Sequence, residues 1–220
     1  IKLNKLTRGT PFFGNNTNNS GNSDFENEFK KIKYFKFKKI DDFDFSQPEL
    51  IFTKDNSIIF FDGDGSIFKI NSQLKEVWKV NYYSKNEKKL SPILYFEQDG
   101  KNIIVADTLS KYYSIDLETG NLLWSSENSS PFNSNIKNFK DTFFVADFDN
   151  VIRCFSKLDG KEIWNFETEN SFIKSQKKLS LILKGETVFF INNLGDITAL
   201  NANDGSLVWQ TPTQSNVIYQ

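Results

Sequence analysis

The stretch GDITALNANDGSLVW, residues 195–209, decides the fold. It joins a run with alternating apolar residues to an Asn-Asp-Gly turn, and then to a second apolar run that ends in tryptophan. Alternation with a period of two is typical of a β-strand, and a glycine after Asp accepts the positive φ that tight hairpin turns require. The stretch therefore predicts two antiparallel strands joined by a tight turn.

The same unit occurs four times along the chain. Its closing tryptophans are Trp78, Trp124, Trp164 and Trp209, at separations of 46, 40 and 45 residues. A period in the forties, built from short strands, indicates one propeller blade per repeat. We therefore expect an all-β propeller of four-stranded antiparallel blades. The blades should lie at about residues 48–85, 91–128, 134–169 and 179–212.

The tryptophan and a glycine four residues before it recur together in the last three repeats, as Gly120, Gly160 and Gly205. The first repeat lacks this glycine and is one residue shorter there, which predicts a shorter turn. Indole is broad and apolar with one N–H donor, so we expect the tryptophans to wedge between blades and bond a backbone carbonyl. A platform for a carbohydrate or a cofactor is the alternative, but four equivalent positions favour a structural role.

The N-terminal part differs from the repeats. Residues 1–31 are expected to be irregular, since Asn, Ser and Gly dominate 14–23 and cannot bury apolar surface. Lysines alternate with aromatic residues between 34 and 38, which predicts a half-buried strand belonging to the propeller region, 32–220. Such a pattern also occurs in nucleic-acid-binding segments. Acidic residues follow directly and cancel the charge, so an outer strand with solvated lysines is favoured.

Composition excludes several classes of function. The 220 residues carry a net charge of −1, so no global field would attract nucleic acid or an anionic membrane surface. The sequence contains no histidine, hence no Ser-His-Asp triad or His-ligated metal site within it. The single cysteine, Cys154, cannot form an intrachain disulfide and is expected to be a small buried apolar residue.

Two acidic motifs allow a functional and a structural interpretation. Asp62-Gly63-Asp64-Gly65 could pass for a calcium-binding turn, but its spacing fails the EF-hand pattern and favours a hairpin. Asp147 and Asp149 lie at the end of an expected strand and are interpreted as turn residues.

The chain begins with Ile1 and has no methionine, so we expect its natural N-terminus, with any export signal, to lie outside this sequence.

Three stretches resemble the PQQ-like propeller repeat: DGSIFKI at 64–70, YSIDLETGNLLW at 113–124, and the opening stretch at 195–209. The resemblance covers about residues 48–212. It implies an open arc cut from a larger ring, of eight blades in the family. The repeat is shared by quinoprotein dehydrogenases and by non-catalytic scaffolds, so the fold alone does not decide the function.

The sequence is most similar to the BamB family of periplasmic lipoproteins, which belong to the outer-membrane β-barrel assembly machinery. That resemblance implies binding to the barrel-forming assembly protein, to unfolded outer-membrane clients, or to both. It implies no enzyme activity and no cofactor, no nucleic acid, and a membrane link only through a lipid anchor absent from this sequence. A dehydrogenase using pyrroloquinoline quinone and Ca²⁺ is the alternative, but its adjacent cysteines have no counterpart here.

The longest connection between repeats runs from residue 167 to 179. It places Phe172 and Ile173 beside Lys174 among polar residues, and an exposed apolar pair rimmed by charge suits protein docking. BamB-like proteins use a Leu-rich segment with an Arg in a comparable loop, and Ser171-Phe172-Ile173-Lys174 is the nearest counterpart. The alternative is that Phe172 and Ile173 cover the edge of a blade.

Overall fold

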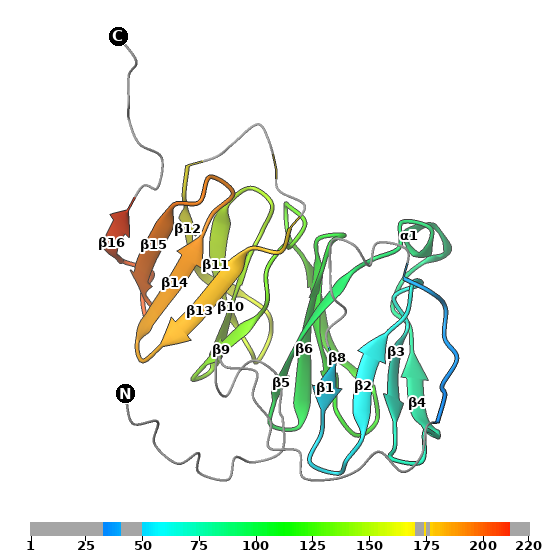
Figure 1. Cartoon of the computed structure of the whole chain (residues 1–220). Coiled ribbons are helices and arrows are strands. Elements are labelled where there is room, and N and C mark those ends of the chain that lie inside the picture. Colours follow the sequence, from blue (N-terminus) through cyan, green and yellow to red (C-terminus); the bar gives the residue numbers. More distant parts are fainter. Residues whose placement is uncertain (1–32, 41–49, 170–173, 175–176, 212–220) are drawn as a thin grey trace, which may run out of the picture.

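The computed structural model describes residues 33–40, 50–169, 174 and 177–211. These residues form four antiparallel sheets of four strands, here called blades 1 to 4, arranged side by side in an arc that does not close (Figure 1). Blade 1 contains β1 (Ile51–Phe52), β2 (Ile58–Phe61), β3 (Ile67–Ile70) and β4 (Glu76–Val80). Blade 2 contains β5 (Leu94–Asp99), β6 (Asn102–Asp107), β7 (Lys111–Asp116) and β8 (Leu122–Glu127).

Blade 3 contains β9 (Lys137–Phe139), β10 (Thr142–Ala146), β11 (Val151–Ser156) and β12 (Glu162–Glu167). Blade 4 contains β13 (Ser180–Lys184), β14 (Thr187–Ile191), β15 (Ile197–Asn201) and β16 (Leu207–Thr211). The strands follow chain order in every blade, so each blade is a simple meander. The first strands β1, β5, β9 and β13 contact one another in sequence, which places the fourth strands on the outer side of the arc.

Every blade contains the same irregularity between its third and fourth strands. The register shifts by one residue after the residue that pairs with the tryptophan, and the four sites are Lys69/Ile70, Ser114/Ile115, Cys154/Phe155 and Ala199/Leu200. A bulge at this point increases the local twist and re-aims the side chains beside it. The bulge that orients the tryptophan is therefore present at the same position in all four blades.

The hydrophobic core lies between the blades rather than in one central cluster. Blades 1 and 2 meet through an edge-to-face contact of Phe61 with Phe96, whose ring centroids are 5.7 Å apart. Blades 2 and 3 meet through Tyr112 and Phe155, at 4.5 Å. Blades 3 and 4 share another cluster of buried side chains. Each blade is thus stabilised mainly by its neighbours, as in other repeat architectures.

The strand expected within residues 32–40 is not present in the part that the structure describes. Residues 33–40 have no regular secondary structure and pass along the side of blade 1 that faces away from blade 2 (Figure 1). The prediction was wrong because these residues pack on the face of the sheet through side chains, instead of pairing with its edge. A backbone hydrogen bond from Gly63 N–H to the Lys38 carbonyl, at 3.3 Å, joins them to the blade.

The only helix in the described residues is α1 (Lys85–Lys88), a single turn between blades 1 and 2. It begins at Ser84, which forms a capping box with Glu87. No helix in this described part of the chain is long and apolar enough to span a membrane.

Candidate functional site

The blades are joined by contacts between a tryptophan of one blade and a turn glycine of the next. Each glycine has a φ of +73°, and a Cβ placed on it would lie within 3.0 Å of the indole. The three pairs are Trp78 with Gly120, Trp124 with Gly160, and Trp164 with Gly205. A side chain at these positions would be disfavoured by the positive φ and would also clash with the indole ring. Glycine is therefore required for two independent reasons.

The indole N–H groups complete the first two contacts. Trp78 donates to the carbonyl of Leu117 at 3.2 Å, and Trp124 donates to the carbonyl of Lys157 at 2.9 Å. Both acceptors lie three residues before the receiving glycine, so the turn supplies a cradle and an acceptor together. The Trp164 Nε1 is buried and finds no hydrogen-bond partner among the described residues.

Trp209 differs from the other three tryptophans. We expected it to dock a neighbouring blade, but no described residue follows blade 4, and 43% of Trp209 is exposed. Trp78, by comparison, is 8% exposed. Among the described residues, the Trp209 ring packs against Phe189 of its own blade, with ring centroids 6.0 Å apart.

Ion pairs also cross each boundary between blades. Lys69 is buried between blades 1 and 2, where its Nζ lies 3.2 Å from carboxylate oxygens of both Asp55 and Glu118. Burial raises the pKa of Asp55, but hydrogen bonds from Thr53 and Lys69 outweigh it and lower the pKa to about 2.

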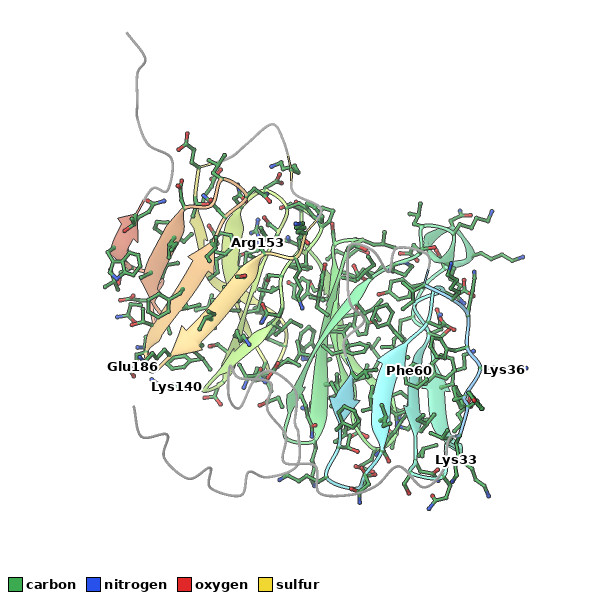
Figure 2. The ribbon with its side chains drawn as sticks, viewed as in Figure 1. Lys33, Lys36, Phe60, Lys140, Arg153 and Glu186 are labelled. Carbon is green, nitrogen blue, oxygen red and sulfur yellow. The ribbon has the colours of Figure 1, made fainter. Side chains whose placement is uncertain are left out.

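The two remaining boundaries have ion pairs of their own. Lys157 pairs with Asp99 at 2.9 Å, between blades 3 and 2. Lys140 pairs with Glu186 at 3.1 Å, between blades 3 and 4, at their lower end in Figure 2. Because these pairs lie beside the glycine-bearing turns, they set neighbouring blades in register at the same end of the arc.

The turns between second and third strands lie at the opposite end of the blades. Each begins with a buried Asp or Asn whose side-chain oxygen accepts backbone N–H groups two and four residues further on; these residues are Asp62, Asp107, Asp147 and Asn192. This geometry is a turn cap. It gives Asp62 a structural role, and Asp147 is further bound by Arg153, whose Nε lies 2.8 Å away (Figure 2).

The connection from blade 3 to blade 4 lies on this same end of the arc. Lys174 forms an ion pair with Asp149 at 3.0 Å, and its hydrogen bond lowers the pKa of Asp149. Asn150 fixes the start of the connection to blade 3, since its side-chain amide donates a hydrogen bond to the carbonyl of Glu169 at 2.9 Å. Phe172 and Ile173 lie outside the described residues, so the structure places the anchors of the expected docking loop but not its apolar tip.

Exposed aliphatic side chains on the outer strands were not singled out from the sequence. The residue directly before each tryptophan is between 50% and 56% exposed, and the four are Val77, Leu123, Ile163 and Val208. The sequence could have indicated them, because an aliphatic residue directly precedes the tryptophan in every repeat. Neighbouring residues of a strand point to opposite faces, so this residue must face away from the tryptophan's side. They form one apolar position per blade along the outer rim.

Cys154 is buried in the cluster between blades 3 and 4. Burial raises the pKa of its thiol to about 11. It occupies the same position in its blade as Lys69 and Ala199 do in theirs, paired with the tryptophan. Since a protonated, buried thiol is a poor nucleophile, Cys154 is a packing residue.

Comparison with known proteins supports this architecture. BamB from Moraxella catarrhalis is similar in structure with a TM-score of 0.54 and 17% identity, over 74% of this chain and 47% of its own. The computationally designed Ika8 protein gives a TM-score of 0.60 and 13% identity, over 75% and 48%. The β-propeller domain of Cps50 (Swd1) from Myceliophteria thermophila gives 0.57 and 14%, over 76% and 55%. These likenesses show the propeller fold, and the chain spans about half the length of the proteins concerned.

No curated protein matches the chain. The family model described as outer membrane protein assembly factor BamB matches residues 63–218, from the turn after β2 to beyond the end of β16. Because this match covers most of the sequence and takes in parts of all four blades, the chain belongs to the BamB family of PQQ-like propeller proteins.

Proposed function

We propose that this protein is a non-catalytic scaffold in the assembly of outer-membrane β-barrel proteins, and that it works in the periplasm. The observation that carries the proposal is the family match over residues 63–218. The partners proposed are the barrel-forming assembly protein and unfolded outer-membrane clients. Two surfaces of the arc suit these two kinds of partner.

The first surface is the connection between blades 3 and 4, proposed to dock the assembly protein. Its anchors are held by the pair of Lys174 with Asp149 and by Asn150, so an apolar tip at Phe172 and Ile173 would be presented from a fixed base. Docking surfaces of this kind combine an apolar centre with a charged rim.

The test is a pull-down with the purified assembly protein. Replacing both Phe172 and Ile173 with Asp should abolish capture and leave the melting temperature within about a degree. Leu158→Asp is the matched control, because Leu158 is 87% exposed and lies in the turn at the other end of blade 3. Capture by the double variant at the level of the control, or a large fall in its melting temperature, would contradict this docking site.

The second surface is the outer rim, proposed to bind unfolded clients. The outer strands β4, β8, β12 and β16 each pair with one strand only in the described residues, so each offers a free edge. An extended chain can add to such an edge through main-chain hydrogen bonds, and pockets for its side chains add selectivity. The half-exposed Val77, Leu123, Ile163 and Val208 place one apolar contact on every edge.

Client binding can be separated from docking by a second pair of variants. Leu123→Ser combined with Ile163→Ser should weaken binding of an unfolded outer-membrane protein several-fold, measured by fluorescence anisotropy, while capture of the assembly protein stays unchanged. Leu158→Ser is the control for loss of an exposed leucine elsewhere. Equal client affinity in the rim variant and the control would rule out the rim.

We also propose that the chain has no catalytic role. The one cysteine is buried between blades 3 and 4 and has no adjacent cysteine, so it does not offer the exposed cysteine pair that stacks on a quinone. Titration with pyrroloquinoline quinone and Ca²⁺, followed by isothermal calorimetry, should show no saturable binding. Tight binding would contradict the scaffold function and support a quinone-dependent dehydrogenase instead.

A further inference from the structure

The connection between blades 1 and 2 exposes an apolar side chain among basic ones. It contains α1, and Leu90, which directly follows the C-terminal cap Lys89, is 66% exposed. Lys85 and Lys89 are exposed as well, and Lys88 is half-buried. We call residues 84–92 the α1 loop. It lies at the end of the blades that carries the turns between second and third strands (Figure 1).

The connection between blades 2 and 3 shows what joining two blades requires. It runs from residue 128 to 136, which is shorter than the run from 81 to 93, and it contains no charged residue. Its apolar side chains Phe132 and Ile136 are completely buried in the cluster between the two blades. Joining blades therefore requires neither an exposed leucine nor a group of lysines, and the tip of the α1 loop needs another explanation.

The α1 loop is anchored on both blades that flank it. Before the loop, Tyr83 is buried, and its hydroxyl donates a hydrogen bond to the carboxylate of Asp107 in the turn after β6. At the other end, Pro92 packs beside Gly65 of blade 1, where a Cβ on the glycine would lie 2.7 Å from the proline Cγ. The two ends of the loop are thus held in place by packing and by a buried hydrogen bond.

Glu87 fixes the loop from within. One of its carboxylate oxygens accepts a hydrogen bond from the Ser84 backbone N–H at 2.7 Å, and the other pairs with the Lys111 Nζ at 2.5 Å. The bond from Lys111, followed by those from Ser84, lowers the pKa of Glu87 to about 2. The charge of Glu87 is therefore balanced by Lys111. Among the described residues, the three lysines of the loop form no ion pair that would balance theirs.

We propose that the α1 loop is a second docking point for the assembly protein, where the three lysines bind an acidic surface and Leu90 enters an apolar pocket within it. This inference rests on the proposed function. A loop that is rigid before binding loses little conformational entropy when it binds. Exposed charges speed association and fix orientation, while a central apolar side chain supplies affinity. The loop shares its end of the arc with the connection around Lys174, so one partner lying across this end can contact both.

The test is calorimetric titration of the full chain with the purified assembly protein, at about 0.05 and 0.5 M salt, because salt screens exposed charges. Replacing Lys85, Lys88 and Lys89 together with Gln should weaken binding about tenfold at low salt and remove most of its salt dependence. Leu90→Ser should weaken binding about tenfold at both salt concentrations, since the loss of apolar burial is not screened.

Matched controls change the same residue types at the opposite end of the arc. Lys54, Lys101 and Lys184 are exposed in turns there, and their joint replacement with Gln alters the net charge equally. Leu158→Ser is the control for Leu90→Ser, because Leu158 is 87% exposed. Both controls should bind as the wild type does, and all variants should keep its melting temperature within about a degree, as exposed substitutions do.

The possible failures are distinguishable. A wild type that does not bind the assembly protein would overturn the proposed function and this inference together. A wild type that binds, with loop variants equal to their controls, would overturn the α1 loop alone. Vesicles containing phosphatidylglycerol provide a further arm. If the lysine variant loses vesicle binding but keeps its affinity for the assembly protein, the loop contacts a membrane surface, and the inference is wrong.

Discussion

Gly160→Ala tests the contact that holds neighbouring blades together. The alanine Cβ would lie 2.7 Å from the Trp124 ring, about 1 Å inside the usual carbon–carbon contact distance of about 3.7 Å. The residue also has a φ of +73°, which disfavours any side chain. The backbone cost for alanine is about 1–2 kcal/mol, and overpacking a fixed ring adds about 1–3 kcal/mol. We therefore expect a loss of about 2–5 kcal/mol in the free energy of unfolding.

Gly185→Ala separates the two costs. Gly185 has a φ of +61° but meets nothing within 4 Å, so its substitution measures the backbone cost alone. Urea unfolding of both variants, followed by tryptophan fluorescence and by circular dichroism, should give Gly160→Ala the larger loss by about 1–3 kcal/mol. The combination of Gly160→Ala with Trp124→Leu should recover part of that difference, since the smaller side chain leaves room for the Cβ.

Equal losses for Gly160→Ala and Gly185→Ala would refute the reasoning. They would mean that the ring moves aside at no cost, and that the glycine is kept only for its backbone conformation. The tryptophan–glycine pairs would then not determine how closely the blades approach.

Three further substitutions test other parts of the arc. Trp78→Ala should cost about 3–5 kcal/mol by urea unfolding, and Trp209→Ala about 1 kcal/mol or less, because of these two residues only Trp78 lies beneath another blade in the described part of the chain; similar values would refute this. Lys69→Met should change stability little in the same assay, while Lys69→Ala should be clearly destabilising, because a buried ion pair is replaced better by apolar volume than by a cavity. Burial raises the pKa of Asp107 in the folded state, so its contribution is full below about pH 4 and is lost as pH rises through the folded pKa. Asp107→Asn should therefore remove part of the decline in wild-type stability towards neutral pH, and parallel pH profiles would contradict this.

Much of the architecture could be predicted from the sequence because the same repeat occurs four times. Alternation, turn glycines and tryptophans together placed sixteen strands in four blades, and the missing residue near Leu74 predicted the shorter first turn. That turn closes through a bond from Leu74 N–H to the Asn71 carbonyl, three residues apart, instead of the four-residue bond from Gly120 to Asp116. Local spacing was sufficient here because a hairpin is a local structure.

The features that the sequence did not predict depend on residues far apart in the chain. Residues 33–40 alternate lysine with aromatic residues as an edge strand does, and only the contacts of Phe35 with Phe60 and Phe68 show that this segment lies on the face of blade 1. Lys69 resembles a solvent-exposed strand residue, yet it is buried because Asp55 and Glu118 reach it from two different blades. Trp209 has the sequence of its three counterparts, and its exposure is decided by what lies next to blade 4.

The division between inner boundaries and outer rim bears on how this propeller can change without losing its fold. Stability resides in contacts between adjacent blades, and these use one face of each outer strand for tryptophan. The other face and the free edge take no part in those contacts, which leaves Val77, Leu123, Ile163 and Val208 open to substitution at small cost. Under the proposed function, partner specificity can therefore vary along the rim and in the connection around Lys174 while the tryptophan–glycine pairs stay fixed. It follows that variants selected for altered client binding should cluster on the rim and in that connection, and a deep mutational scan that scores folding and binding separately should show the two sets of positions as nearly disjoint.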